Sequence, residues 1–196
     1  MEYSISYIWD KGSRPVNQDS LHYIHMSVSG HSFIMAVVAD GIGSFTYSEE
    51  ASGYLVRELA RTFRIMLRRH PDSGMNYYMR GLKRCLYRTH RTLSEYGRYN
   101  NTPIATTCSL VFIKDRKAFL LHLGDGRILY NNRLLTPSHC DRHGHLTAAI
   151  GIAEYQRAYI RRLRFRRNSH ILLCTDGYYK HGSKDNKSSI LITVSI

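Results

Sequence analysis

The first forty residues of the chain are built from short apolar stretches of the kind that form β-strands. Three of them, YSISYIWD, LHYIHMSV and HSFIMAVVAD, are rich in β-branched and aromatic residues. The dipeptide Ser29-Gly30 separates the last two stretches and favours a tight turn. This part of the sequence therefore predicts three strands, with the second and third joined by a short turn.

Two longer stretches follow, and they have the spacing of amphipathic helices. From Tyr47 to His70, and again from Met75 to Tyr96, apolar side chains recur three and four residues apart. Glutamates lie at the start of the first stretch and arginines at its end, which suits the helix dipole. The pattern predicts two helices with these apolar positions: Ala51, Tyr54, Leu55, Leu59, Phe63, Met66 and Leu67, then Tyr78, Met79, Leu82, Cys85, Leu86 and Leu93.

Strand-like stretches return after Pro103 and continue to the end of the chain. They are ATTCSLVFI, KAFLLHLGD, GRILYNN, RLLTP, QRAYIRRLRFR, SHILLCTDG and SSILITVSI. A block of strands, two helices and a second block of strands is typical of an α+β fold with mainly antiparallel sheets. Because no linker or internal repeat interrupts this order, we expect residues 1–196 to form a single domain.

The composition suits a folded domain without a membrane segment. Of the 196 residues 43% are hydrophobic, and the apolar runs are far shorter than the roughly 20 residues that span a bilayer. The first residues lack the apolar segment of a signal peptide. The cysteines have no framework spacing, so we expect reduced thiols and a cytoplasmic location; they are Cys85, Cys108, Cys140 and Cys174.

The chain is strongly basic. It carries 28 Lys and Arg against 15 Asp and Glu, a net charge of +13, which attracts phosphate groups on nucleic acids, lipids or proteins. In QRAYIRRLRFRRN, Arg162, Arg164 and Arg166 alternate with Leu163 and Phe165. This period of two predicts a strand with one basic face, which is either merely solvated or binds a partner.

Three apolar runs end in the same dipeptide, Asp-Gly. They are FIMAVVADG, AFLLHLGDG and HILLCTDG, ending at Asp40, Asp125 and Asp176. Asp-Gly is a common hairpin turn, and a strand does follow Asp125. A predicted helix follows Asp40, however, and no strand follows Asp176. Two further aspartates, Asp19 and Asp185, lie in turn-like segments.

Five aspartates at strand ends are unusual in so basic a chain. Clustered carboxylates repel one another and raise one another's pKa unless cations lie among them. Oxygen ligands select Mg²⁺ or Mn²⁺ over Zn²⁺. The sequence therefore indicates a metal site, and the alternative is five unrelated turn aspartates.

Six motifs in this order resemble the metal-dependent Ser/Thr protein phosphatases (PPM, type 2C), especially the small bacterial ones. The motifs are RPVNQDS, VVADGIGSFTYSEEAS, ATTCSLVF with FLLHLGDGRILY, LLTPSH with LTAAIG, ILLCTDG and KDN. The resemblance extends from about Tyr7 to Ile196. It implies a four-layer α-β-β-α sandwich in which two antiparallel sheets pack face to face with helices outside.

The resemblance also implies the roles of the aspartates. Asp40 would bridge two Mn²⁺ or Mg²⁺ ions, with the Gly41 carbonyl binding one of them. Asp176 and Asp185 would hold the other ion, and Asp19 would act through a water on the metal. Asp125 would match the acidic residue of a third site that binds its ion more weakly.

The implied reaction is hydrolysis of phosphoserine and phosphothreonine in phosphorylated proteins. Two ions about 3.5–4 Å apart would make a hydroxide from a bridging water, and this hydroxide would attack phosphorus in line. The planar guanidinium of Arg14 would hold the substrate phosphate. The family also implies a Ser/Thr kinase that opposes the phosphatase.

The chain departs from the family pattern at several positions. Gln18 replaces a glutamate, Gly126 follows Asp125 in place of serine, and Ile42 and Ser44 change the segment after Gly41. The stretch before LTAAIG is too short for the flap that many relatives carry. Only eight residues separate Asp176 from Asp185, where relatives often insert helices. We therefore expect a minimal member with an open site.

Three other hypotheses remain open from the sequence. A zinc site would use the histidines and cysteine of SHCDRHGH, namely His139, Cys140, His143 and His145, although their spacing matches no standard finger. A nucleic-acid-binding module would use the basic charge and the fifteen tyrosines, but no recognition motif is present. A catalytically weak or inactive relative would bind phosphoproteins without hydrolysing them.

Overall fold

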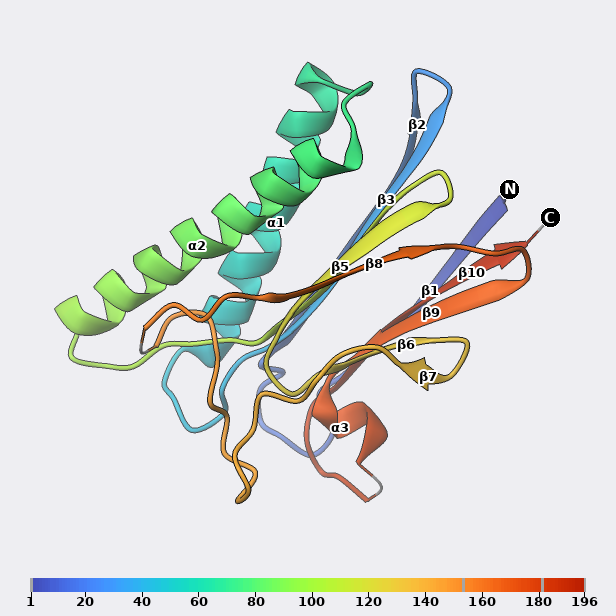
Figure 1. Ribbon diagram of the computed structural model, residues 1–196. Coiled ribbons are helices and arrows are strands. Elements are labelled where there is room, and N and C mark those ends of the chain that lie inside the picture. The colour runs from blue at the N-terminus through green and yellow to red at the C-terminus, as the bar shows by residue number, and fades with distance from the viewer. Residues whose placement is uncertain (1, 153, 181, 196) are drawn as a thin grey trace.

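Two antiparallel sheets stack face to face in the computed structural model, which describes residues 2–152, 154–180 and 182–195 (Figure 1). The first sheet has the order β1 (Glu2–Asp10), β10 (Lys187–Ser195), β9 (Ser169–Cys174), β6 (Arg127–Tyr130) and β7 (Arg133–Leu134). The second has the order β2 (Asp19–Val28), β3 (His31–Asp40), β4 (Cys108–Lys114), β5 (Lys117–Leu123) and β8 (Tyr159–Arg164). The α+β class with two antiparallel sheets is therefore confirmed.

Strand β3 lies between β2 and β4 in the second sheet and is buried on both faces. Ile34 and Val38 face the first sheet and pack among its apolar side chains, such as Ile171. Phe33 and Val37 belong to the other core cluster, on the helix side. Burial on both faces explains why this segment is an unbroken apolar run and does not alternate with polar residues.

The two long helices cover the outer face of the second sheet (Figure 1). Helix α1 (Ser48–Arg69) and helix α2 (Met75–Tyr99) agree with the sequence prediction, although α2 continues three residues beyond Tyr96. They pack closely at Gly81, where a Cβ atom would lie only 2.3 Å from the terminal carbon of Met66. No helix in the described part of the chain is both long and apolar enough to cross a membrane.

The outer face of the first sheet is far less covered. Within the described ranges, the only helix on that side is the four-residue α3 (Asp176–Tyr179), near one end of the sheet (Figure 1). The sequence pattern does not predict this turn of helix. Only eight residues lie between Asp176 and Asp185, so this connection has no room for a longer helix. The predicted final strand is observed to Ser195, and its last residue lies outside the described residues.

Several strand ends meet at one end of the sandwich. In the second sheet, the start of β2 lies beside the end of β3, and the start of β4 beside the end of β5. In the first sheet, the start of β6 lies beside the end of β9, and the start of β10 beside the end of β1. Since a three-residue connection joins β5 to β6, these ends of both sheets lie together. All five predicted aspartates lie at these strand ends or within two residues of them.

Candidate metal and phosphate site

Asp19 and Asp40 lie directly opposite each other in the antiparallel pairing of β2 with β3. Asp19 is only 1% exposed, and its Oδ2 atom accepts a hydrogen bond of 3.0 Å from the hydroxyl of Thr175. Its Oδ1 atom is buried and has no hydrogen-bond partner among the described residues. A buried carboxylate oxygen without a donor is costly unless a cation or water satisfies it.

The backbone at Asp40 is fixed by two threonines before β4. The Asp40 amide donates to the Thr107 hydroxyl at 3.0 Å, and its carbonyl accepts from the Thr106 hydroxyl at 2.9 Å. The next residue, Gly41, lies where a Cβ atom would be 2.3 Å from the backbone oxygen of Ser48. Glycine is therefore required here by close approach of the chain to the start of α1.

Four of the predicted aspartates, Asp19, Asp40, Asp125 and Asp176, lie close enough for their charges to affect one another's pKa. The pKa of Asp40 is raised well above its usual value, first by burial and then by Asp19, Asp176 and Asp125. Burial raises the pKa of Asp19 to about 6. Burial and Asp176 also raise the pKa of Asp125. Such mutual destabilisation of the charged forms is relieved when cations bind between the groups.

Asp185 and Asp176 each form an ion pair with a basic side chain. The guanidinium of Arg14 binds Asp185 with two hydrogen bonds, Nε to Oδ1 at 3.1 Å and Nη2 to Oδ2 at 3.0 Å. The ammonium group of Lys180 lies 2.6 Å from Asp176 Oδ2. The hydrogen bond and charge of Asp185 raise the pKa of Arg14 further. Both pairs lie near the surface, where a competing cation can reach them.

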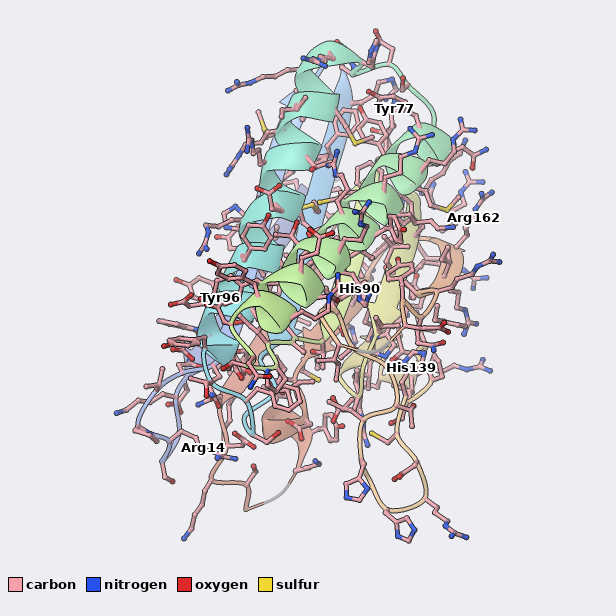
Figure 2. All side chains as sticks on the ribbon, turned by 90° about the vertical axis from the view of Figure 1, so that its left-hand side faces the viewer. Arg14, Tyr77, His90, Tyr96, His139 and Arg162 are labelled. Carbon is pink, nitrogen blue, oxygen red and sulfur yellow. The ribbon has the colours of Figure 1, made fainter. Side chains whose placement is uncertain are left out.

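Arg14, Asp40 and Asp185 line one cavity of about 420 Å³ at this end of the molecule. Its other walls are Gln18 and the backbone segment from Gly41 to Ser44. Figure 2 shows Arg14 at the end opposite Tyr77, near the start of α2. The short connection after Asp176 thus brings Asp185 to the same cavity as Asp40. Asp125 and Asp176 do not line it.

The side chains expected to bind metal have the chemistry that hard divalent ions prefer. All the expected ligands are oxygen atoms, one carboxylate oxygen of Asp19 is buried without a partner, and the carboxylates repel one another. Among the described residues, however, no three His, Cys, Asp or Glu side chains are grouped as they would be around an ion. The carboxylates of Asp185 and Asp176 are instead paired with basic side chains, those of Arg14 and Lys180.

The SHCDRHGH segment has the hydrogen bonds of a surface loop. The backbone amides of His143 and His145 both donate to Asp141 Oδ1, and Cys140 pairs with Leu146 in an isolated bridge. His139 lies within hydrogen-bond distance of the Gly124 backbone. The finding that no three ligand side chains gather in the described residues applies here too, so the zinc hypothesis gains no support.

Asn186 belongs to the site although no sequence pattern predicts a role for it. It is 3% exposed, its Oδ1 accepts from the Gln18 amide at 2.8 Å, and its Nδ2 donates to the carbonyls of Lys11 and Val16. These bonds clamp the loop that carries Arg14 to the strand end after Asp185. Thr175 was missed in the same way. Asn186 follows the predicted ligand Asp185, and Thr175 precedes the predicted ligand Asp176. This adjacency is the signal in the sequence that could have identified both residues.

The sequence comparisons identify one family. The family model described as protein phosphatase 2C matches residues 12–192. A search of curated proteins found no match to this chain. The match covers all five predicted aspartates and every strand except β1 and the last three residues of β10.

Solved structures share the fold at low sequence identity. PppA, a key regulatory component of T6SS in Pseudomonas aeruginosa, aligns with a TM-score of 0.79 at 18% identity over 98% of this chain and 97% of its own. The serine/threonine phosphatase Stp1 from Staphylococcus aureus gives 0.81 at 16% identity, with 100% and 96% covered. The catalytic domain of the phosphatase PstP, in complex with two manganese ions, gives 0.76 at 16% identity, with 99% of each chain covered.

Proposed function

The chain belongs to the protein phosphatase 2C family, and we propose that it hydrolyses phosphoserine and phosphothreonine in phosphorylated proteins. The observation that carries this proposal is the placement of Asp19 opposite Asp40 at the edge of a cavity that also presents Arg14. Buried, mutually repelling carboxylates beside a guanidinium are suited to hold cations and a phosphate together.

We propose that two Mn²⁺ or Mg²⁺ ions bind at this edge. Asp40 and the Gly41 carbonyl would hold one ion, and Asp40 with Asp176 and Asp185 would hold the other. Asp19 would hold a water ligand, and Asp125 would contribute to a third, weaker site. Bound in this way, two divalent ions supply a nucleophile from water at neutral pH and neutralise the phosphoryl oxygens.

The remaining steps depend on the chain's own side chains. Arg14 would release Asp185 and bind two oxygens of the substrate phosphate through its planar fork. Asn186 would hold the Arg14 loop in place during this exchange, because it binds three backbone groups of that loop. Thr175 would keep Asp19 oriented towards Asp40. No protein nucleophile is proposed, so no phosphoenzyme should form.

Hydrolysis of p-nitrophenyl phosphate tests this proposal. We expect turnover that requires Mn²⁺ or Mg²⁺ and is lost in the Asp40→Asn variant, while Asp72→Asn, at an exposed aspartate between the two long helices, retains it. Absence of turnover with any divalent ion would contradict the proposal and favour a phosphoprotein-binding relative. Salt-sensitive binding of RNA or DNA without turnover would favour the nucleic-acid module.

We further propose that residues 1–196 act as a single phosphatase domain opposed by a Ser/Thr kinase. The single domain is supported by the full antiparallel pairing of β1 with β10, which joins the two ends of the chain. A reducing compartment such as the cytoplasm is supported by the four free thiols, three of them buried.

A further inference from the structure

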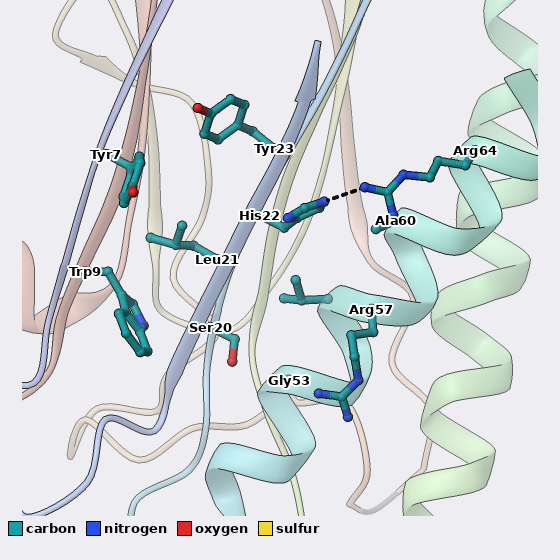
Figure 3. A pocket seen from close by; sticks show the side chains of 11 residues that line it. Tyr7, Trp9, Ser20, Leu21, His22, Tyr23, Gly53, Arg57, Ala60 and Arg64 are labelled. Carbon is teal, nitrogen blue, oxygen red and sulfur yellow. Dashed lines mark hydrogen bonds between the residues drawn. The ribbon is translucent and has the colours of Figure 1, made fainter. Parts of the chain in front are cut away.

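Strand β2 has one unpaired edge beside the catalytic end of the molecule. It is the first strand of the second sheet and, within the described residues, pairs only with β3. Strand β1 is likewise an edge strand of the first sheet. A groove of about 780 Å³ follows this edge between β1, β2 and α1 (Figure 3). Unpaired edges present free backbone donors and acceptors to any extended chain that reaches them.

One wall of the groove is apolar and aromatic. Tyr7 and Trp9 of β1 are 58% and 57% exposed, which is unusual for such large side chains. Leu21 and Tyr23 of β2 lie on the same side, and the rings of Tyr7 and Tyr23 are 6.2 Å apart. Figure 3 shows these four side chains gathered between the two strands.

The other wall is basic and comes mainly from α1. Arg57 and Arg64 line it together with His22, whose Nε2 atom lies 3.2 Å from Arg64 Nη2 (Figure 3). No acidic side chain lines the groove, and neither arginine forms a salt bridge with any described residue. The alternation along β2 separates the walls, because Leu21 and Tyr23 point one way and Ser20 and His22 the other.

The groove reaches the proposed catalytic edge directly. Ser20 lines it and is the neighbour of Asp19, and the indole of Trp9 donates to the Asp19 carbonyl at 3.0 Å. A chain lying along β2 would therefore approach the Asp19 and Asp40 carboxylates at the start of that strand.

We propose that this groove binds an extended segment of the phosphoprotein substrate as an additional strand on β2. The segment would carry alternating side chains, apolar ones against Tyr7 and Tyr23 and acidic ones against Arg57 and Arg64. Because β2 runs away from the catalytic end, an antiparallel segment runs towards it, so the segment lies N-terminal to the phosphorylated residue. This inference rests on the proposed phosphatase function and adds its substrate preference.

The basic charge of the groove and the free backbone edge of β2 favour a peptide over a second copy of the chain or a nucleic acid. A second copy of the chain would bring the same net charge of +13 to a basic wall. A nucleic acid has the phosphates but lacks the amide pattern that pairs with a strand edge. An acidic, extended peptide satisfies both the arginines and the free edge of β2.

Phosphothreonine peptides of matched length test the proposal. One carries an N-terminal arm of alternating Glu and Leu, a second has the same arm C-terminally, and a third has Lys in place of Glu. We expect the first peptide to have the highest kcat/KM and to lose about tenfold with Arg57→Glu/Arg64→Glu at low salt. The control Arg61→Glu changes an arginine of the same helix that pairs with Glu58 and lies outside the groove.

The backbone pairing has its own test. Methylation of alternate amides in the arm should weaken the first peptide about tenfold in one register and leave it unchanged in the other, because only every second amide faces β2. Equal effects in both registers would overturn the strand pairing.

Hydrolysis of p-nitrophenyl phosphate separates this proposal from the function on which it rests. The double arginine variant should keep that activity, because the small substrate does not reach the groove. Activity on the small substrate with no preference among the three peptides would overturn the groove proposal alone. A change in oligomeric state of the double variant, measured by light scattering, would also overturn it in favour of contact between two copies.

Discussion

Asp19, the first residue of β2, lies opposite Asp40, the last residue of β3, and both carboxylates are largely buried. The antiparallel pairing therefore places two like charges side by side in a poorly solvated position. Burial is the main cause that raises the pKa of both groups; repulsion from Asp19 raises that of Asp40 further, and repulsion from Asp176 raises that of Asp19. This arrangement lowers the stability of the metal-free chain at neutral pH, and a bound cation would reverse the effect.

Replacing Asp40 by asparagine should separate stability from activity. In metal-free protein at pH 7 we expect the free energy of unfolding to rise by on the order of 1 kcal/mol, because a buried negative charge disappears. Phosphatase activity should fall at least about 10²-fold, because the carboxylate proposed to hold both ions is lost. Urea denaturation with a chelator and hydrolysis of p-nitrophenyl phosphate measure the two effects. A metal-free variant less stable than wild type would contradict the repulsion argument.

Thr175 should control metal affinity through Asp19. Its hydroxyl donates to Asp19 Oδ2, so Thr175→Val leaves that carboxylate free to turn and removes a donor from a buried acceptor. We expect Mn²⁺ affinity, measured by calorimetry, to fall about tenfold or more. Thr175→Ser keeps the hydroxyl and should restore most of the affinity. Equal affinities in the valine and serine variants would show that the hydrogen bond has no such role.

Much of the site could be predicted from local sequence because each aspartate follows a recognisable apolar run. The run before Asp40 becomes a doubly buried strand, and the Asp-Gly dipeptide after it marks the strand end. The same reasoning could not predict the contacts of Asn186 with the Arg14 loop. Those contacts join residues about 170 positions apart, and they depend on the pairing of β1 with β10.

The layers could be predicted only in part. The spacing of apolar residues in α1 and α2 indicates that each helix packs against a surface, but it does not indicate which sheet forms that surface. Whether helices cover the outer face of the first sheet depends on the length of the insertion after Asp176, and this chain has only a short one. Helix α3 has four residues, too few to show a helical period.

Arg14 and Lys180 should differ in their importance for catalysis although both pair with a carboxylate that we propose as a metal ligand. In the Arg14→Ala variant, Mn²⁺ binding should tighten by up to about fivefold, because a competing cation is removed from an exposed carboxylate. Its kcat/KM should nevertheless fall about 10²-fold, because the proposed bidentate contact with the substrate phosphate is lost. The Lys180→Ala variant should bind Mn²⁺ more tightly and retain its turnover. Loss of turnover in both variants would contradict the assignment of Arg14 to the phosphate.

His122 should make the stability of the protein depend on pH below neutrality. The ring is fully buried on β5, donates from Nε2 towards the carbonyls of Gly124 and Pro137, and accepts from Ser109 at Nδ1. Burial, followed by the nearby His139, lowers the pKa of His122 to about 4. The unfolded chain therefore binds a proton at this position between about pH 6.5 and 4, where the folded chain does not.

The stabilising contribution of neutral His122 should be complete above about pH 6.5 and decline as the pH falls towards 4, by about 3 kcal/mol in total. Urea denaturation at several pH values should show a steeper decline for wild type than for His122→Asn. The variant should also be less stable than wild type at pH 7.5, because the two carbonyls lose their buried donor. His143→Asn, on the exposed loop, should follow the wild-type curve. Parallel curves for wild type and His122→Asn would show that this ring does not set the pH dependence.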